Sequence, residues 1–125
     1  MSQENPSSQL DVEFIYLPVI NYSMQQNRIP VIRLLSIKNN TERPLTDLKV
    51  SLTLEPEFAL VSPVMVEKLA SGEIIKITGL HLTLDPSFFI QQTERLSGSI
   101  VLVVSNGADE FFREKYPIDI LAFDQ

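Results

Sequence analysis

The clearest periodic pattern in the chain is an alternation of apolar and polar residues just before Pro56. The apolar positions are Leu48, Val50, Leu52 and Leu54, and the residues between them are polar. Because side chains of a strand point alternately to its two faces, this pattern predicts a strand with one buried face. Pro56 cannot donate to a sheet and is expected to end it. The preceding run NNTERPLTD (39–47) is predicted to be a loop.

Further short apolar or alternating runs, bounded by turn-forming residues, predict more strands. They are residues 10–17, 19–24, 31–38, 58–62, 64–69, 73–84, 100–104 and about 110–123. Pro18 separates the first two, so the second is expected to pair with a different partner. In 73–84 the apolar parity changes, which predicts a bulge near Thr78 and Gly79. Asn106-Gly107 predicts a hairpin turn.

These elements predict an all-β fold, an immunoglobulin-like antiparallel β-sandwich of 7–9 strands. Asp85 and Pro86 are typical of a helix start, so one short helical turn is expected near 86–92. The polar residues 1–9 are expected to form a disordered tail, which leaves 10–125 as one domain of ordinary size.

Composition limits the classes of function. The 125 residues carry a formal net charge of −6 and only 10 Lys and Arg, so direct nucleic-acid binding is not expected. There is no Cys, which excludes thiol chemistry and disulfides. The first residues do not resemble a signal peptide, and no apolar run approaches the ~18–20 residues that span a bilayer. A cytoplasmic protein is expected.

No group of residues in the sequence indicates a catalytic, cofactor or metal site. His81 is the only histidine, and zinc needs about four ligands, so a solvent-facing strand residue is expected. Asp109, Glu110 and Glu114 are too sparse for calcium and are expected to charge a turn. A carbohydrate platform is not indicated, because there is no Trp and two of the three tyrosines, Tyr16 and Tyr116, fall within strands.

Three apolar residues are candidates for a docking surface. Phe88 lies beside the predicted helical turn, and Leu121 and Phe123 lie at the end of the last strand. An exposed Phe at either place would mark a contact for another protein segment. The alternative for Phe88 is that it closes one end of the sandwich.

Two sets of residues resemble known proteins. LSIKNNTERPLTDLKVSLTLEP and VEKLASGEIIKI resemble bacterial immunoglobulin-like modules, which implies that Leu69 anchors the core, Gly72 takes a turn and Glu73 faces solvent. YLPVINYSMQQNRIPVIRLLSIKNNT, TERLSGSIVLVV and YPIDILAFDQ resemble the N-terminal region of large bacterial proteins. Those proteins continue into a segment of unknown function and a superfamily-one helicase-like core. Phe123 stands where that family more usually has Tyr.

The second resemblance implies an excised N-terminal domain, and none of the family's helicase motifs is present, so no ATPase residue carries over. The sequence therefore predicts a non-catalytic accessory or protein-interaction domain of a larger intracellular bacterial protein. Its partner would be the remainder of that protein or another protein. Two alternatives stay open. One is a secreted or surface ligand-binding or adhesion module, and the other is an enzyme with an unrecognised acidic site.

Overall fold

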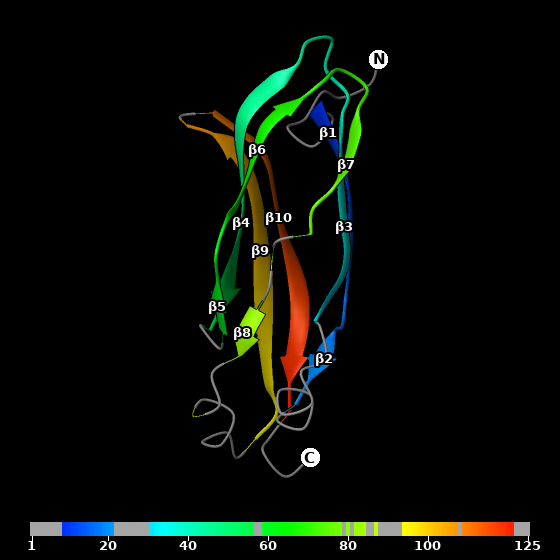
Figure 1. Cartoon of the computed structure of the whole chain (residues 1–125). Helices are drawn as coiled ribbons and strands as arrows, with labels where there is room; N and C mark the ends of the chain where they lie inside the picture. Colours follow the sequence, from blue (N-terminus) through cyan, green and yellow to red (C-terminus); the bar gives the residue numbers. More distant parts are fainter. Residues whose placement is uncertain are drawn as a thin grey trace.

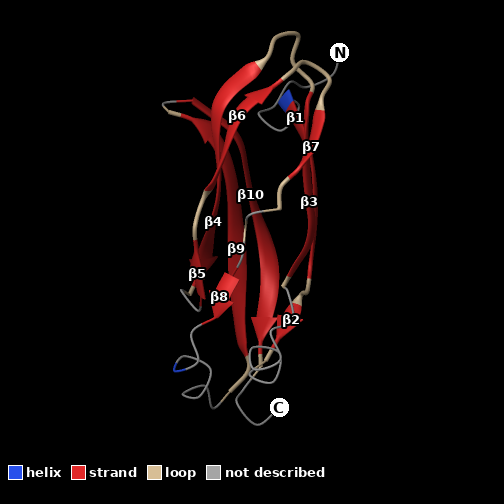
Figure 2. Ribbon diagram, viewed as in Figure 1, coloured by secondary structure: helices blue, strands red, loops and turns tan. Residues whose placement is uncertain are grey.

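The computed structural model describes residues 9–21, 31–56, 59–78, 80, 82–84, 87, 94–107 and 109–121. Most of these residues lie in strands (Figure 2). In chain order the strands are β1 (Leu10–Tyr16), β2 (Val19–Ile20), β3 (Ile32–Asn39), β4 (Leu45–Glu55), β5 (Ala59–Val61), β6 (Val64–Leu69), β7 (Ile74–Lys76), β8 (Leu82–Leu84), β9 (Leu96–Asn106) and β10 (Asp109–Ile120).

Two sheets form the layers of a β-sandwich, which confirms the predicted fold class. One sheet has the order β2-β10-β9-β4-β6 and the other the order β1-β3-β7 (Figure 1). β5 and β8 pair with each other in a short two-stranded ribbon, toward the end of the sandwich opposite the β3–β4 connection (Figure 1). The succession β10-β9-β4-β6 corresponds to the G, F, C and C′ strands of variable-type immunoglobulin domains.

The chain changes sheets between β1 and β2, as Pro18 predicts. β1 pairs with β3, whereas β2 pairs with β10. The sheets are antiparallel, as predicted, except at this point, where β2 and β10 run parallel. A sequence pattern gives the presence of a strand but not the direction of a partner some 100 residues away.

The predicted single strand over 73–84 is wrong. β7 pairs with β3 and β8 pairs with β5, so the two ends of this segment belong to different sheets. Ile77 and Leu80, which have opposite parity, are both buried between them. The parity conflict is therefore resolved by a change of sheet and not by one bulge. The two sheets of the sandwich hold eight strands, within the predicted 7–9, and β5 and β8 add a separate two-stranded ribbon among the described residues.

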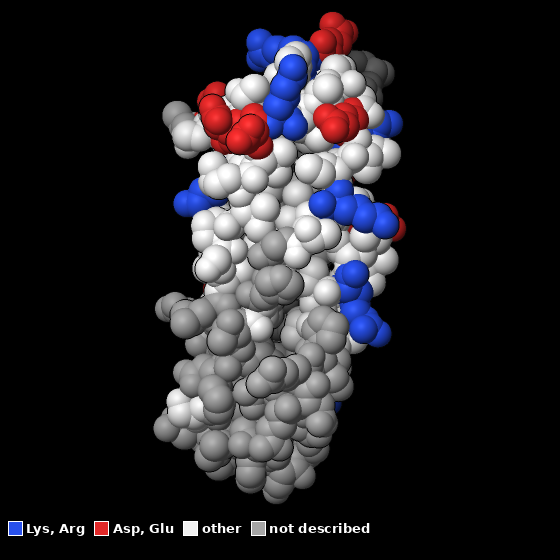
Figure 3. All heavy atoms as spheres, viewed as in Figure 1, with Lys and Arg blue, Asp and Glu red and all other residues white. Residues whose placement is uncertain are grey.

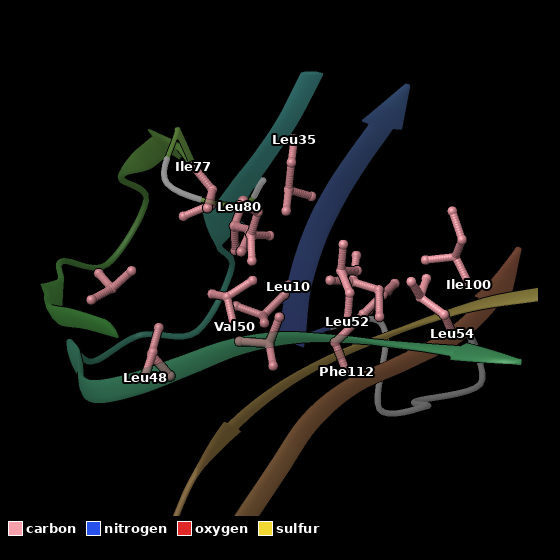
Figure 4. Packing of buried hydrophobic residues seen from close by; sticks show 14 of the residues in the cluster. Leu10, Leu35, Leu48, Val50, Leu52, Leu54, Ile77, Leu80, Ile100 and Phe112 are labelled. Atoms are coloured by element: carbon pink, nitrogen blue, oxygen red, sulfur yellow. The ribbon is translucent and has the colours of Figure 1, made fainter. Parts of the chain in front are cut away.

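The core lies between the two main sheets, and β4 supplies one side of it. Leu48, Val50, Leu52 and Leu54 are all buried, as their alternation predicts. Figure 4 shows them facing Leu10, Leu35 and other apolar side chains of the opposite sheet. β9 lies between β4 and β10, and its Ile100, Leu102 and Val104 are buried. The continuous apolar run IVLVV is thus explained by a central position in the sheet.

The turns agree with the residues that predict them, with one correction. Gly72 and Gly107 have φ of +79° and +53°, a region that favours glycine. Leu69 is buried and Glu73 is exposed, as the resemblance to bacterial modules implies. The loop predicted over 39–47 is too long, because β3 ends at Asn39 and β4 begins at Leu45. Asp47 takes a φ of +53° within β4, which Asp tolerates better than most residues.

The predicted tail over 1–9 and the helical turn near 86–92 lie almost entirely outside the described residues.

Candidate interaction surface

The docking residues predicted from the sequence are only partly described. Phe88, Phe123 and also His81 lie outside the described residues. Leu121 is half-buried, and its backbone N–H donates a hydrogen bond of 2.9 Å to the carbonyl of Ile20. The backbone just beyond the end of β10 is therefore bonded to the segment at β2.

The acidic residues near the β9–β10 hairpin are exposed, in agreement with a charged turn. Glu110 and Arg113 form a bidentate pair, with Arg113 Nη2 2.9 Å from Glu110 Oε1. Hydrogen bonding to Arg113 lowers the pKa of the Glu110 carboxyl. Among the described residues, no group of three His, Cys, Asp or Glu lies close enough to hold a metal ion.

A cluster of three aromatic side chains, Phe14, Tyr16 and Tyr116, joins the two sheets along one side of the sandwich. Phe14 stacks on Tyr16 with ring centroids 5.0 Å apart, and Tyr116 meets Phe14 edge-on at 4.8 Å. The Tyr16 hydroxyl donates a hydrogen bond of 2.5 Å to the carbonyl of Pro117, which lies on the other sheet. Burial raises the pKa of both tyrosines, and the charge of Glu114 adds to the rise for Tyr116.

This side of the sandwich is flanked by two strand edges, those of β10 and β1. The β10 edge is already protected. Asp119 donates its N–H to the Pro18 carbonyl, so by alternation the backbone groups of Pro117, Lys115 and Arg113 also face away from β9. Pro117 has no N–H to offer, its carbonyl is bonded to Tyr16, and a bulge interrupts the strand near Phe111. Pro, Lys and bulges are the features by which natural sheets prevent pairing at an edge.

The β1 edge has fewer of these features, because the register shift in its pairing with β3 lies at its end, between Ile15 and Tyr16. The carbonyl of Gln9 accepts a hydrogen bond from the N–H of Asn40, and the N–H of Leu17 donates to the carbonyl of Val31. The backbone groups of the odd-numbered residues of β1 therefore face β3. The backbone groups of Val12 and Phe14 therefore face away from β3. No described residue pairs with β1 on that side. β1 is seven residues long and contains no Pro or Lys.

A network of hydrogen bonds around Asn39 holds the connections at one end of the sandwich. Asn39 Nδ2 donates to the carbonyls of Arg43 and Leu69, each at 2.9 Å. Asn39 Oδ1 accepts from the N–H of Thr41 at 2.8 Å and lies 2.6 Å from its hydroxyl. Asn39 is the one polar residue fully buried in the described part of the chain. In Figure 3, charged side chains of both signs are mixed over this end.

Sequence reasoning missed both the Asn39 network and the open β1 edge. In the sequence, Asn39 looks like the other turn-forming residues of the run 39–47. Only its complete burial in the structure distinguishes it from them. The alternation in residues 10–17 gives the inward face of β1 but cannot show that one of its edges is unpaired.

Neither the protein-family models nor the curated proteins searched include a match to this chain. In the described part of the chain, no helix is long and apolar enough to cross a membrane.

Proposed function

We propose that this is a non-catalytic protein-interaction domain that binds an extended protein segment along the open edge of β1. The observation that supports the proposal is the contrast between two neighbouring edges. The β10 edge carries Pro117, Lys115 and a bulge, whereas no described strand pairs with the β1 edge at Val12 and Phe14.

Strand addition is a common way for a sheet to bind a peptide. Backbone hydrogen bonds supply affinity, and contacts with alternate side chains supply specificity. An added strand beside β1 would lie next to the Phe14, Tyr16 and Tyr116 cluster. Its inward side chains would find apolar ring surface there.

The resemblance to helicase-like proteins supplies a setting for the proposal. In that setting the domain is the N-terminal module of a larger cytoplasmic bacterial protein, and the bound segment belongs to the remainder of that protein or to another protein. The surface beside Leu121 would be a second contact with the parent. The net charge of −6 favours a protein partner over nucleic acid.

Val12→Pro is expected to prevent strand addition and leave the domain folded. Its lost N–H points away from β3, so the substitution removes an edge donor and no ladder bond. We expect about tenfold or greater weakening of binding, because a hydrogen bond is lost and the pyrrolidine ring obstructs pairing. The measurement is a titration of the ¹⁵N-labelled domain with ten-residue peptides in which Val alternates with Ser, Lys or Glu.

Glu13→Pro is the matched control for the direction of the backbone groups. Its N–H bonds β3, so this variant should lose stability in urea while Val12→Pro melts close to the unmodified domain. The proposal would be wrong if peptides shifted only amides of another edge, such as β6, or if Val12→Pro bound them unchanged.

A further inference from the structure

The side chains along the open edge of β1 indicate what kind of segment it would accept. Asp11, Glu13 and Ile15 point to the outer face of the sheet, and Val12 and Phe14 point inward. All three outward side chains are exposed, Ile15 by 47%. The outer face of β1 thus carries two acidic side chains, Asp11 and Glu13, and then the apolar Ile15.

The acidic charges on this edge are incompletely neutralised. Asp11 lies opposite Lys38 on β3, but Glu13 lies opposite Ser36. Within the described residues, neither Asp11 nor Glu13 has an ion pair.

The basic side chains of the neighbouring β10 do not neutralise this charge. Arg113 is paired with Glu110 at 2.9 Å, and Lys115 with Glu55 at 3.2 Å. Glu114 is exposed and near Tyr116, and it adds a further negative charge beside the aromatic cluster. The charges without an ion pair on β1 and beside the aromatic cluster, those of Asp11, Glu13 and Glu114, are therefore all negative. The basic residues of the same sheet, Arg33, Lys38 and Lys76, lie on β3 and β7, on the side of β1 away from its open edge.

The direction of the β1 backbone groups places the acidic side chains at positions where they would interact most strongly with the side chains of an added strand. Val12 and Phe14 would exchange hydrogen bonds with an antiparallel partner. Asp11, Glu13 and Ile15 would then occupy the non-hydrogen-bonded pairs, in which the side chains of facing residues lie closest. Opposite charges at such positions stabilise pairing, and like charges destabilise it.

We infer that the segment bound by β1 is an extended, antiparallel peptide in which Lys or Arg occupies two alternate positions, opposite Glu13 and Asp11, preceded by an apolar residue opposite Ile15. The residues between them are apolar and face the aromatic cluster. This inference rests on the proposed function, because it assumes that β1 accepts a strand.

A second copy of this chain is a less suitable occupant. Two β1 edges paired around Glu13 would place acidic residues opposite one another, and two copies would each bring a charge of −6. The basic residues of β10 already have acidic partners and lie on a strand that contains Pro117.

The test is a comparison of two synthetic ten-residue peptides, one alternating Val with Lys and the other Val with Glu, at low salt. Binding to the ¹⁵N-labelled full chain is followed at the amides of Val12 and Phe14. The Lys peptide is expected to bind more tightly. Glu13→Lys should weaken its binding about 2- to 30-fold and strengthen binding of the Glu peptide, because one favourable pair becomes a like-charge pair.

Glu67→Lys is the matched control, because Glu67 is also exposed and lies on β6, an edge strand of the other sheet. It changes the net charge equally and should leave the preference intact. Equal binding of both peptides at β1, or an equal effect of the two variants, would overturn the inference and leave the proposed function standing. Protection of the β1 amides on raising domain concentration without peptide would overturn it in favour of a second copy. If no peptide affects β1, the proposed function itself fails.

Discussion

Asn39→Asp is expected to destabilise the domain by about 3–5 kcal/mol at pH 7, a large part of the ~5–15 kcal/mol typical of a small domain. The substitution changes shape very little. It replaces the Nδ2 group, which donates to the carbonyls of Arg43 and Leu69, with an oxygen that accepts. Two carbonyls lose their donor, and a negative charge is placed among oxygens in a fully buried site.

The loss should depend on pH in a defined direction. Burial and the facing carbonyls would raise the pKa of the introduced carboxyl above its ordinary value of about 3.9. A group whose pKa is raised on folding stabilises the folded state below its unfolded pKa, and this contribution is lost as pH rises. Urea melts of the variant should therefore approach those of the parent near pH 4 and fall behind toward pH 7.

Asn40→Asp is the control, because Asn40 is the exposed neighbour and receives the same chemical change. Its free energy of unfolding should stay within about 0.5 kcal/mol of the parent. Similar losses of stability at the two positions would contradict a buried hydrogen-bond network around Asn39. A loss for Asn39→Asp that does not vary with pH would contradict it as well.

Leu52→Ala is expected to cost about 2–5 kcal/mol of stability, because it removes buried methyl groups and leaves a cavity in the core. Leu52 is buried on the inner face of β4, opposite Leu102 of β9. Thr53→Ala, one residue further along the strand, changes an exposed side chain and should cost no more than about 0.5 kcal/mol.

The pair is measured by urea unfolding of both variants under the same conditions. A difference of less than about 1 kcal/mol between them would contradict the register of β4 and with it the assignment of its inner face.

The parts of the fold that could be predicted from the sequence are those set by local physics. The alternation before Pro56 gives the inner face of β4, because strand side chains alternate whatever the partner. Pro18 marks the change of sheet after β1, since it cannot continue a ladder. Gly72 and Gly107 mark turns because their backbone angles favour glycine.

The parts that could not be predicted depend on which distant segments meet. Nothing near Tyr16 indicates that its hydroxyl bonds Pro117, a residue 101 positions away. The parity change in 73–84 fits a bulge or a change of sheet equally well, and only the partners of β7 and β8 decide between them. The candidate site was missed for the same reason, because an open edge is defined by the absence of a partner on one side.

Hydrogen exchange at single amides of β1 tests the central claim most directly. In the free domain, the amides of Val12 and Phe14 should exchange rapidly because they face away from β3, whereas those of Glu13 and Ile15 should be protected by the ladder. Addition of the Lys–Val peptide should slow Val12 and Phe14 and leave the β6 amides unchanged. Protection of Val12 and Phe14 in the free domain, or no change on adding any of the peptides, would contradict the account.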